Sequence, residues 1–225
     1  MTDASHRLGS AAAPLRLPPL YPIIDVDLCG MRGVDPSTFA SACVGAGARI
    51  LQVRQKGSAG GDGVFLDIVR AVIAAARPAG ARVIVNDRAD LAAMSGADGV
   101  HVGQQDLPPG LAQTIAGRHA IVGISTHTTE QIAEAGVGSA DYIAVGPVFR
   151  TSTKETGYDP RGLELVRHAA RMGKPVVAIG GITVSNARSV LDAGASSVAI
   201  ISDLLSAADP EARVREFLAI VADER

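Results

Sequence analysis

Short apolar segments alternate with longer, helix-like segments along most of the chain. Several apolar segments follow a glycine and a small residue, as at Gly47-Ala48 and at Gly194-Ala195. Because glycine readily adopts the left-handed conformation that ends a helix, each such point predicts a helix, its end and then a strand. The predicted strands cover residues 21–24, 50–53, 83–85, 99–102, 120–123, 142–145, 175–179 and 198–201.

Helix starts fall between these strands. Asp35-Pro36 and Asp209-Pro210 each place a carboxylate that can accept hydrogen bonds from free backbone amides before a proline at the first helical position. Apolar residues with helical spacing follow Asp209, over residues 214–221. This pattern predicts a closing helix that packs on the core.

Eight strands that alternate with helices leave two architectures, a closed barrel and an open doubly wound sheet. The strand count favours the barrel, and the glycine pair Gly45 and Gly47 precedes its strand instead of following it as in a dinucleotide-binding fold. We therefore expect an α/β protein with a single (β/α)8 TIM barrel as the catalytic domain over residues 20–225, preceded by a flexible leader over residues 1–19. In such a barrel the functional residues lie at the carboxyl ends of the strands.

Composition excludes several classes of function. The 21 basic and 23 acidic residues nearly cancel, and the chain has no tryptophan. A general nucleic-acid binder, which needs a basic surface and stacking rings, is therefore not expected. The apolar runs are far shorter than the roughly 20 residues of a membrane span, so we expect a soluble, cytoplasmic protein. Cys29 and Cys43 lack metal-ligand spacing and are expected to be reduced thiols.

The second predicted strand contains Gln52 and is followed by Arg54 and Lys56, so the three polar residues stand at alternate positions. Because side chains alternate along a strand, these residues share the face opposite Leu51 and Val53. Two cations on one face inside a barrel are costly unless they meet an anion. The pattern therefore favours phosphate or pyrophosphate as the ligand.

Carboxylates follow the third and fourth strands. Asp87 comes after Asn86 at the end of the third strand, and Asp106 follows the fourth. Two carboxylates that face one cleft repel unless a cation lies between them, and Mg2+ typically binds one or two carboxylates together with substrate phosphates. The sequence therefore predicts Mg2+ held by Asp87 and Asp106. His101, within the fourth strand, is expected to be a hydrogen-bonded barrel histidine and not a ligand.

The segments after the sixth, seventh and eighth strands favour phosphate binding. The loop after the sixth strand is dense in hydroxyl groups and ends in a lysine, with Thr151, Ser152, Thr153 and Lys154. Hydroxyls and backbone amides bind phosphate oxygens, and the lysine adds a positive charge. Gly181, Ile201 and Ser202 follow the last two strands, where barrels often hold a phosphate on backbone amides.

Taken together, these segments resemble the thiamine phosphate synthase family, from about residue 21 to residue 202. The motifs that carry the resemblance are Gln52-Val-Arg54-Gln-Lys56, Asn86-Asp87-Arg88, Asp98-Gly-Val-His-Val-Gly-Gln-Gln-Asp106, Gly123-Ile-Ser125-Thr-His, Thr151-Ser-Thr-Lys154 and Ala178-Ile-Gly-Gly181-Ile. Each motif is weak alone, but their order at successive strand ends is specific. The family implies a barrel transferase that joins a hydroxymethylpyrimidine diphosphate to a thiazole phosphate by a dissociative displacement and releases pyrophosphate.

The resemblance also implies a role for each matched residue. It implies that the pyrimidine diphosphate is held by Gln52, Arg54, Lys56, Asn86, Ser125 and Lys154, and that Mg2+ is held by Asp87 and Asp106. It further implies that the thiazole phosphate is held by Thr151, Thr153, Gly181, Ile201 and Ser202. Ser152, in the same loop as Thr151, is also implied to bind substrate. Of these we expect Arg54, Lys56, Ser125 and Lys154 to act in catalysis. Gln55 and Arg150 depart from the family pattern, which puts efficiency in question more than reaction class.

Three other functions fit part of the pattern. A thiazole tautomerase on the same barrel would have no use for a Mg2+-pyrophosphate pocket. A non-catalytic sensor of phosphorylated thiamine precursors would need the same pockets and differs only in turnover. A generic phosphate-binding barrel of amino-acid biosynthesis predicts acid and base pairs that the chain does not place.

Overall fold

The computed structural model describes residues 15–57, 60–151 and 157–222. Eight parallel strands form a closed barrel in which each strand pairs with the next and the last pairs with the first. Their bounds are β1 Leu20–Asp25, β2 Ile50–Arg54, β3 Arg82–Asn86, β4 Gly99–Val102, β5 Ile121–Thr126, β6 Tyr142–Val145, β7 Val176–Ile179 and β8 Ser197–Ile200. Every predicted strand overlaps one of these, and the predicted barrel is confirmed.

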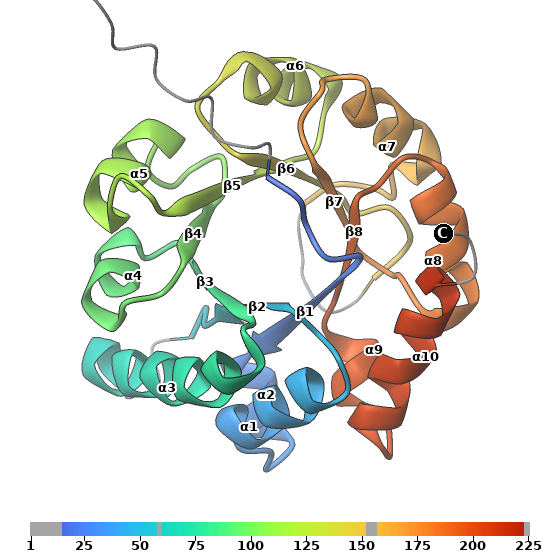
Figure 1. Ribbon diagram of the computed structural model, residues 1–225. Helices are drawn as coiled ribbons and strands as arrows, with labels where there is room; N and C mark the ends of the chain where they lie inside the picture. The colour runs from blue at the N-terminus through green and yellow to red at the C-terminus, as the bar shows by residue number, and fades with distance from the viewer. Residues whose placement is uncertain (1–14, 58–59, 152–156, 223–225) are drawn as a thin grey trace, which may run out of the picture.

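Helices form a ring outside the barrel (Figure 1). They are α1 Val26–Met31, α2 Pro36–Gly45, α3 Gly61–Ala76, α4 Ala89–Ser95, α5 Pro109–Ala116, α6 Thr129–Val137, α7 Gly162–Ala170, α8 Val184–Asp192, α9 Ser202–Leu205 and α10 Pro210–Ala222, with a short 3-10 helix at Arg77–Ala79. The predicted helix starts are confirmed, since Asp35 accepts a hydrogen bond from the Thr38 amide (2.8 Å) and Asp209 from the Ala212 amide (3.0 Å). None of the helices among the described residues is long and apolar enough to cross a membrane.

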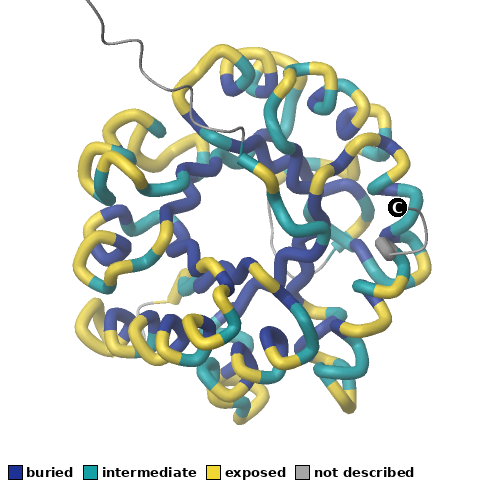
Figure 2. Tube along the Cα trace, viewed as in Figure 1, coloured by how far each residue is buried: buried dark blue, intermediate teal, exposed yellow. Residues whose placement is uncertain are grey.

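Strand alternation divides the apolar side chains into two clusters. Leu51 and Val53 face outward and join the cluster between barrel and helices, whereas Ile50 faces inward. The strands form a largely buried ring, and most exposed positions lie on the outer helices and the loops (Figure 2). The polar side chains of β2 consequently face the barrel interior with Ile50.

The described part of the predicted leader, residues 15–19, lies against the amino-terminal end of the barrel. Leu15 and Leu17 pack on the inner apolar cluster, and the Val198 amide donates to the Pro19 carbonyl (2.9 Å). In Figure 1 the segment before β1 crosses in front of the barrel. This end of the barrel is therefore covered by apolar side chains.

Candidate active site

A cavity of about 220 Å³ lies at the carboxyl ends of the strands. The residues predicted from the sequence that line it are Gln52, Arg54, Asn86, Ser125, Thr151, Gly181, Ile201 and Ser202. They come from five different strand ends and from the loop after β6, so the barrel brings together segments that are distant in sequence. Ser152, Thr153 and Lys154 lie outside the described residues.

The β2 side of the cavity carries a fixed cation. Arg54 forms an ion pair with Asp25, whose side chain is only 2% exposed. The second oxygen of Asp25 accepts a hydrogen bond from the Leu28 amide (3.1 Å) and so caps α1. The ion pair fixes the guanidinium at the cavity wall. Asp25 was not among the predicted residues, although its position at the end of the first strand could have indicated it.

Lys56 lies beyond the end of β2, because the strand stops at Arg54. Its side chain does not line the cavity and is exposed, and its ammonium pairs with the carboxylate of Asp87. The backbone amides of Lys56 and Gly57 donate to Asp27 (2.8 and 2.9 Å). Asp25, the last residue of β1, and Asp27, in α1, thus hold the β2 end, one through Arg54 and the other through this turn.

Asn86 presents a buried donor without a partner. Its side-chain nitrogen has no hydrogen bond to any described residue, although Asn86 is buried and lines the cavity. Leaving a buried polar group unpaired costs about 1–3 kcal/mol. A ligand with an acceptor at this position would remove that cost.

Asp87 and Asp106 follow the neighbouring strands β3 and β4 and lie outside the cavity lining. Asp87 has a positive φ of 63°, and its amide donates to the His101 carbonyl (2.7 Å). Asp106 accepts from the Gly103 amide (2.7 Å). Within the described ranges, no hydrogen bond reaches the second oxygen of either carboxylate.

This donor set fits a magnesium ion. No group of three or more His, Cys, Asp or Glu side chains among the described residues could enclose a metal. Mg2+ does not need such a cage, since it commonly binds one or two carboxylates and completes its shell with water and substrate phosphates. Asp87 and Asp106 each offer one carboxylate oxygen for this.

Hydrogen-bonded polar side chains also line the cavity inside the barrel. The hydroxyls of Tyr21 and Tyr142 are 3.1 Å apart, and the two ring nitrogens of His101 lie 2.9 Å from the Tyr142 and Ser125 hydroxyls. The expected hydrogen bonding of His101 is confirmed, because both ring nitrogens have hydroxyl partners. The tyrosines were not predicted as site residues, and nothing local in the sequence distinguishes them from packing residues.

On the β6 and β7 side of the cavity, glycines allow two loops to approach each other closely. Gly180 and Gly181 both have positive φ, and a Cβ on Gly181 would lie 2.4 Å from the carbonyl oxygen of Arg150. The Arg150 side chain is exposed and absent from the cavity lining. Only glycine therefore fits where the end of β7 meets the loop after β6.

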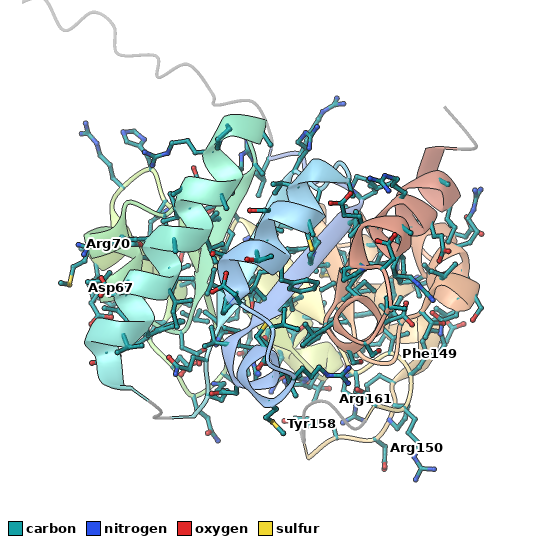
Figure 3. All side chains as sticks on the ribbon, turned by 90° about the horizontal axis from the view of Figure 1, so that it is seen from below. Asp67, Arg70, Phe149, Arg150, Tyr158 and Arg161 are labelled. Atoms are coloured by element: carbon teal, nitrogen blue, oxygen red, sulfur yellow. The ribbon has the colours of Figure 1, made fainter. Side chains whose placement is uncertain are left out.

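An aromatic stack lies beside the mouth of the cavity. The rings of His127 and Tyr158 stack with centroids 4.5 Å apart, and the Arg161 guanidinium lies 4.9 Å from the Tyr158 centroid. Figure 3 shows Arg150, Tyr158 and Arg161 together at one end of the barrel. His127 lines the cavity, so the stack links its wall to the segment before α7.

Comparisons with known proteins agree on one family. The sequence profile described as thiamine monophosphate synthase matches residues 20–204. The thiamine-phosphate synthase of Koribacter versatilis is 43% identical over 93% of this chain and 99% of its own, and that of Anaeromyxobacter dehalogenans is 42% identical over 94% and 90%. A solved thiamine phosphate pyrophosphorylase from Pyrococcus furiosus superposes with a TM-score of 0.81 at 32% identity, covering 91% of this chain and 96% of that one.

Proposed function

The chain belongs to the thiamine monophosphate synthase family, and we propose that its cavity at the carboxyl ends of the strands couples a hydroxymethylpyrimidine diphosphate to a thiazole phosphate. The products are thiamine phosphate and pyrophosphate, and the enzyme is a transferase. The observation that carries this assignment is the 43% identity over nearly the full length of a thiamine-phosphate synthase, together with a cavity lined by the residues of the family motifs.

The reaction breaks the bond between the exocyclic carbon of the pyrimidine and the diphosphate oxygen. The departing pyrophosphate keeps the electron pair, and the pyrimidine ring delocalises the cation that remains. The thiazole nitrogen then donates its lone pair to this carbon. No protein nucleophile is needed, so the side chains act by neutralising the leaving group and by positioning the two substrates.

The pyrimidine diphosphate binds on the β2, β3 and β5 side. Gln52, Asn86 and Ser125 supply uncharged polar groups for the ring, and the unpaired Asn86 nitrogen gains an acceptor there. Arg54 and Lys56 bind the diphosphate. The sequence motif that ends in Lys154 assigns this lysine to the diphosphate as well. Since Asp25 already partners Arg54, the guanidinium is oriented before substrate arrives.

Asp87 and Asp106, which follow the neighbouring strands β3 and β4, would hold Mg2+ for the diphosphate. When bound, Mg2+ supplies positive charge to the leaving pyrophosphate oxygens. Lys56 contacts Asp87, so the ammonium lies beside a carboxylate that we assign to the ion.

The thiazole phosphate binds on the β6, β7 and β8 side. Gly181, Ile201 and Ser202 offer backbone amides near the cavity, and Thr151 adds a hydroxyl. The sequence motif assigns Ser152 and Thr153, which follow Thr151, to the same substrate.

Both substrates are small molecules. Two unpaired, buried thiols support a location in the reducing cytoplasm.

A coupling experiment tests the proposal. Purified protein with both substrates and Mg2+ is expected to release pyrophosphate and to form thiamine phosphate. A pyrophosphate-release assay and mass spectrometry measure the two products. Arg54→Ala is expected to lose most of this turnover, and Arg167→Ala, on the outer face of α7, is the matched control. Tight binding of the pyrimidine diphosphate by folded protein without product would indicate a sensor, and conversion of the thiazole phosphate alone would indicate a tautomerase.

A further inference from the structure

Five side chains from five strands form a continuous hydrogen-bonded line through the barrel. It runs from the Gln52 amide nitrogen to the Tyr21 hydroxyl (3.4 Å), on to the Tyr142 hydroxyl (3.1 Å), to His101 Nδ1 (2.9 Å), and from His101 Nε2 to the Ser125 hydroxyl (2.9 Å). All five side chains line the cavity, and the two at the ends of the line, Gln52 and Ser125, are the ones that the proposed function assigns to the pyrimidine substrate. It therefore connects two contacts to one substrate through three buried side chains.

The protons on this line can be counted. Tyr21 and Tyr142 are fully buried, and burial raises the pKa of both phenols, so each hydroxyl keeps one proton to donate. The His101 ring nitrogens face two neutral hydroxyls, and burying a charged imidazolium between neutral groups is costly. A neutral ring has one N–H donor and one acceptor nitrogen.

The Gln52 amide determines the direction. Its nitrogen can only donate, so the Tyr21 oxygen accepts this hydrogen bond. The Tyr21 hydroxyl then donates to the Tyr142 oxygen. The Tyr142 hydroxyl in turn donates to His101 Nδ1, which is therefore the acceptor nitrogen. The imidazole proton is then on Nε2, which donates to the Ser125 oxygen. In the opposite direction the Tyr21 oxygen would accept twice and its buried proton would have no acceptor among these groups, at a cost of about a lost hydrogen bond.

We infer that Gln52, Tyr21, Tyr142, His101 and Ser125 form a directional hydrogen-bond relay that leaves the Ser125 proton to be donated into the cavity. Tyr21, Tyr142 and His101 are positioning residues, since they act through Ser125. The inference rests on the proposed function only for the identity of the group that Ser125 meets. The direction of the relay is a property of the protein without substrate.

The experiment is ¹⁵N NMR of the histidine side chains in substrate-free protein, with the His101 signal identified by its loss in His101→Gln. The wild-type ring is expected to be neutral with its proton on Nε2. In Gln52→Glu the carboxylate can only accept, so every hydrogen bond on the line should reverse and the proton should move to Nδ1. A wild-type ring that is protonated on Nδ1 or on both nitrogens overturns the relay.

Two controls separate the relay from a simple effect of charge. Asn86→Asp adds the same charge to the same cavity, and Asn86 lies beside His101 in the strand register, yet the relay predicts no change of tautomer there. Adding Tyr21→Phe to Gln52→Glu cuts the line, so the Nε2 tautomer should return. A shift to Nδ1 in Asn86→Asp, or one that survives Tyr21→Phe, contradicts the relay. If Gln52→Glu does not fold, the tautomer of His101 in the wild-type protein tests the direction of the relay by itself.

Turnover provides a second readout. Tyr21→Phe and Tyr142→Phe each remove one hydroxyl and keep the ring, so kcat is expected to fall about tenfold, the equivalent of one hydrogen bond. The KM for thiazole phosphate should stay unchanged. Equal losses in kcat and in thiazole phosphate affinity would indicate a merely structural role. Wild-type protein that shows the expected tautomer but no coupling would contradict the proposed function and leave the relay standing.

Discussion

Asp25 and Arg54 form an ion pair at the cavity wall in which the carboxylate is 2% and the guanidinium 11% exposed. The register of the first two strands places their Cα atoms directly opposite each other. The same carboxylate caps α1 through the Leu28 amide. One side chain therefore ties the start of α1 to the orientation of a cation that we assign to the diphosphate.

Asp25→Asn separates these two functions. Asparagine is as good a helix cap as aspartate, so α1 should keep its amide partner, but Arg54 loses its negative partner. We expect the KM for the pyrimidine diphosphate to rise about tenfold or more, with the KM for thiazole phosphate unchanged, in steady-state kinetics. Asp35→Asn, at the exposed cap of α2, is the matched control. Equal effects of the two substitutions would contradict the positioning role of Asp25.

Asp87→Asn and Asp106→Asn are expected to weaken Mg2+-dependent turnover by more than tenfold. Asparagine is the suitable replacement at position 87 because its backbone φ is 63°, which Asn tolerates better than most residues. Titration of turnover with Mg2+ and calorimetry with thiazole phosphate provide the two measurements. Asp90→Asn, beside the same strand end, is the control. Comparable losses of Mg2+ response and of thiazole phosphate binding would contradict the metal assignment.

Lys56→Ala is expected to lower turnover at saturating substrate by about tenfold to a hundredfold. The ammonium contacts Asp87, so its charge should matter most when the pyrophosphate departs and its negative charge increases. The measurement is kcat with both substrates saturating, with Lys174→Ala, whose ammonium binds backbone carbonyls near the end of α6, as the comparison. A normal kcat in Lys56→Ala would remove this residue from leaving-group stabilisation.

The strands could be predicted from the sequence because a strand and the glycine that precedes it form a local signal. The alternation that put Gln52 and Arg54 on one face was also local, and both residues line the cavity. It could not extend to Lys56, since β2 ends at Arg54. The contact between Tyr21 and Tyr142 joins residues 121 positions apart. Barrel closure creates that contact, so no segment of the chain carries a signal for it.

Cys29 and Cys43 should be unreactive in the folded protein. Burial is the main cause that raises the pKa of each thiol to about 12, and the thiolate is the reactive form. At pH 8 the thiolate fraction is therefore on the order of one in ten thousand. We expect no reaction with a thiol reagent under native conditions and two equivalents after denaturation. Rapid labelling of native protein would contradict the burial of these residues.

Gly123→Ala tests the packing that holds the inner polar groups. A Cβ at this position would lie 2.0 Å from the Tyr142 ring and 2.4 Å from its hydroxyl oxygen. The ring would have to move, although its hydroxyl bonds both Tyr21 and His101. We expect the free energy of unfolding to fall by about 1–3 kcal/mol, as for other overpacked cores. Turnover should fall as well, because Ser125 lies two residues further along the same strand.

The matched control for this substitution is Gly63→Ala on α3, where an added Cβ meets nothing within 4 Å. It should raise stability by about 0.5–1 kcal/mol, as expected for alanine within a helix. Combining Gly123→Ala with Tyr142→Leu relieves the overlap, so the losses of stability in the two single variants should not add. Denaturant unfolding measures the wild type and the four variants. Additive losses in the double variant, or a Gly123→Ala variant as stable as the wild type, would show that Tyr142 does not need the space that Gly123 leaves.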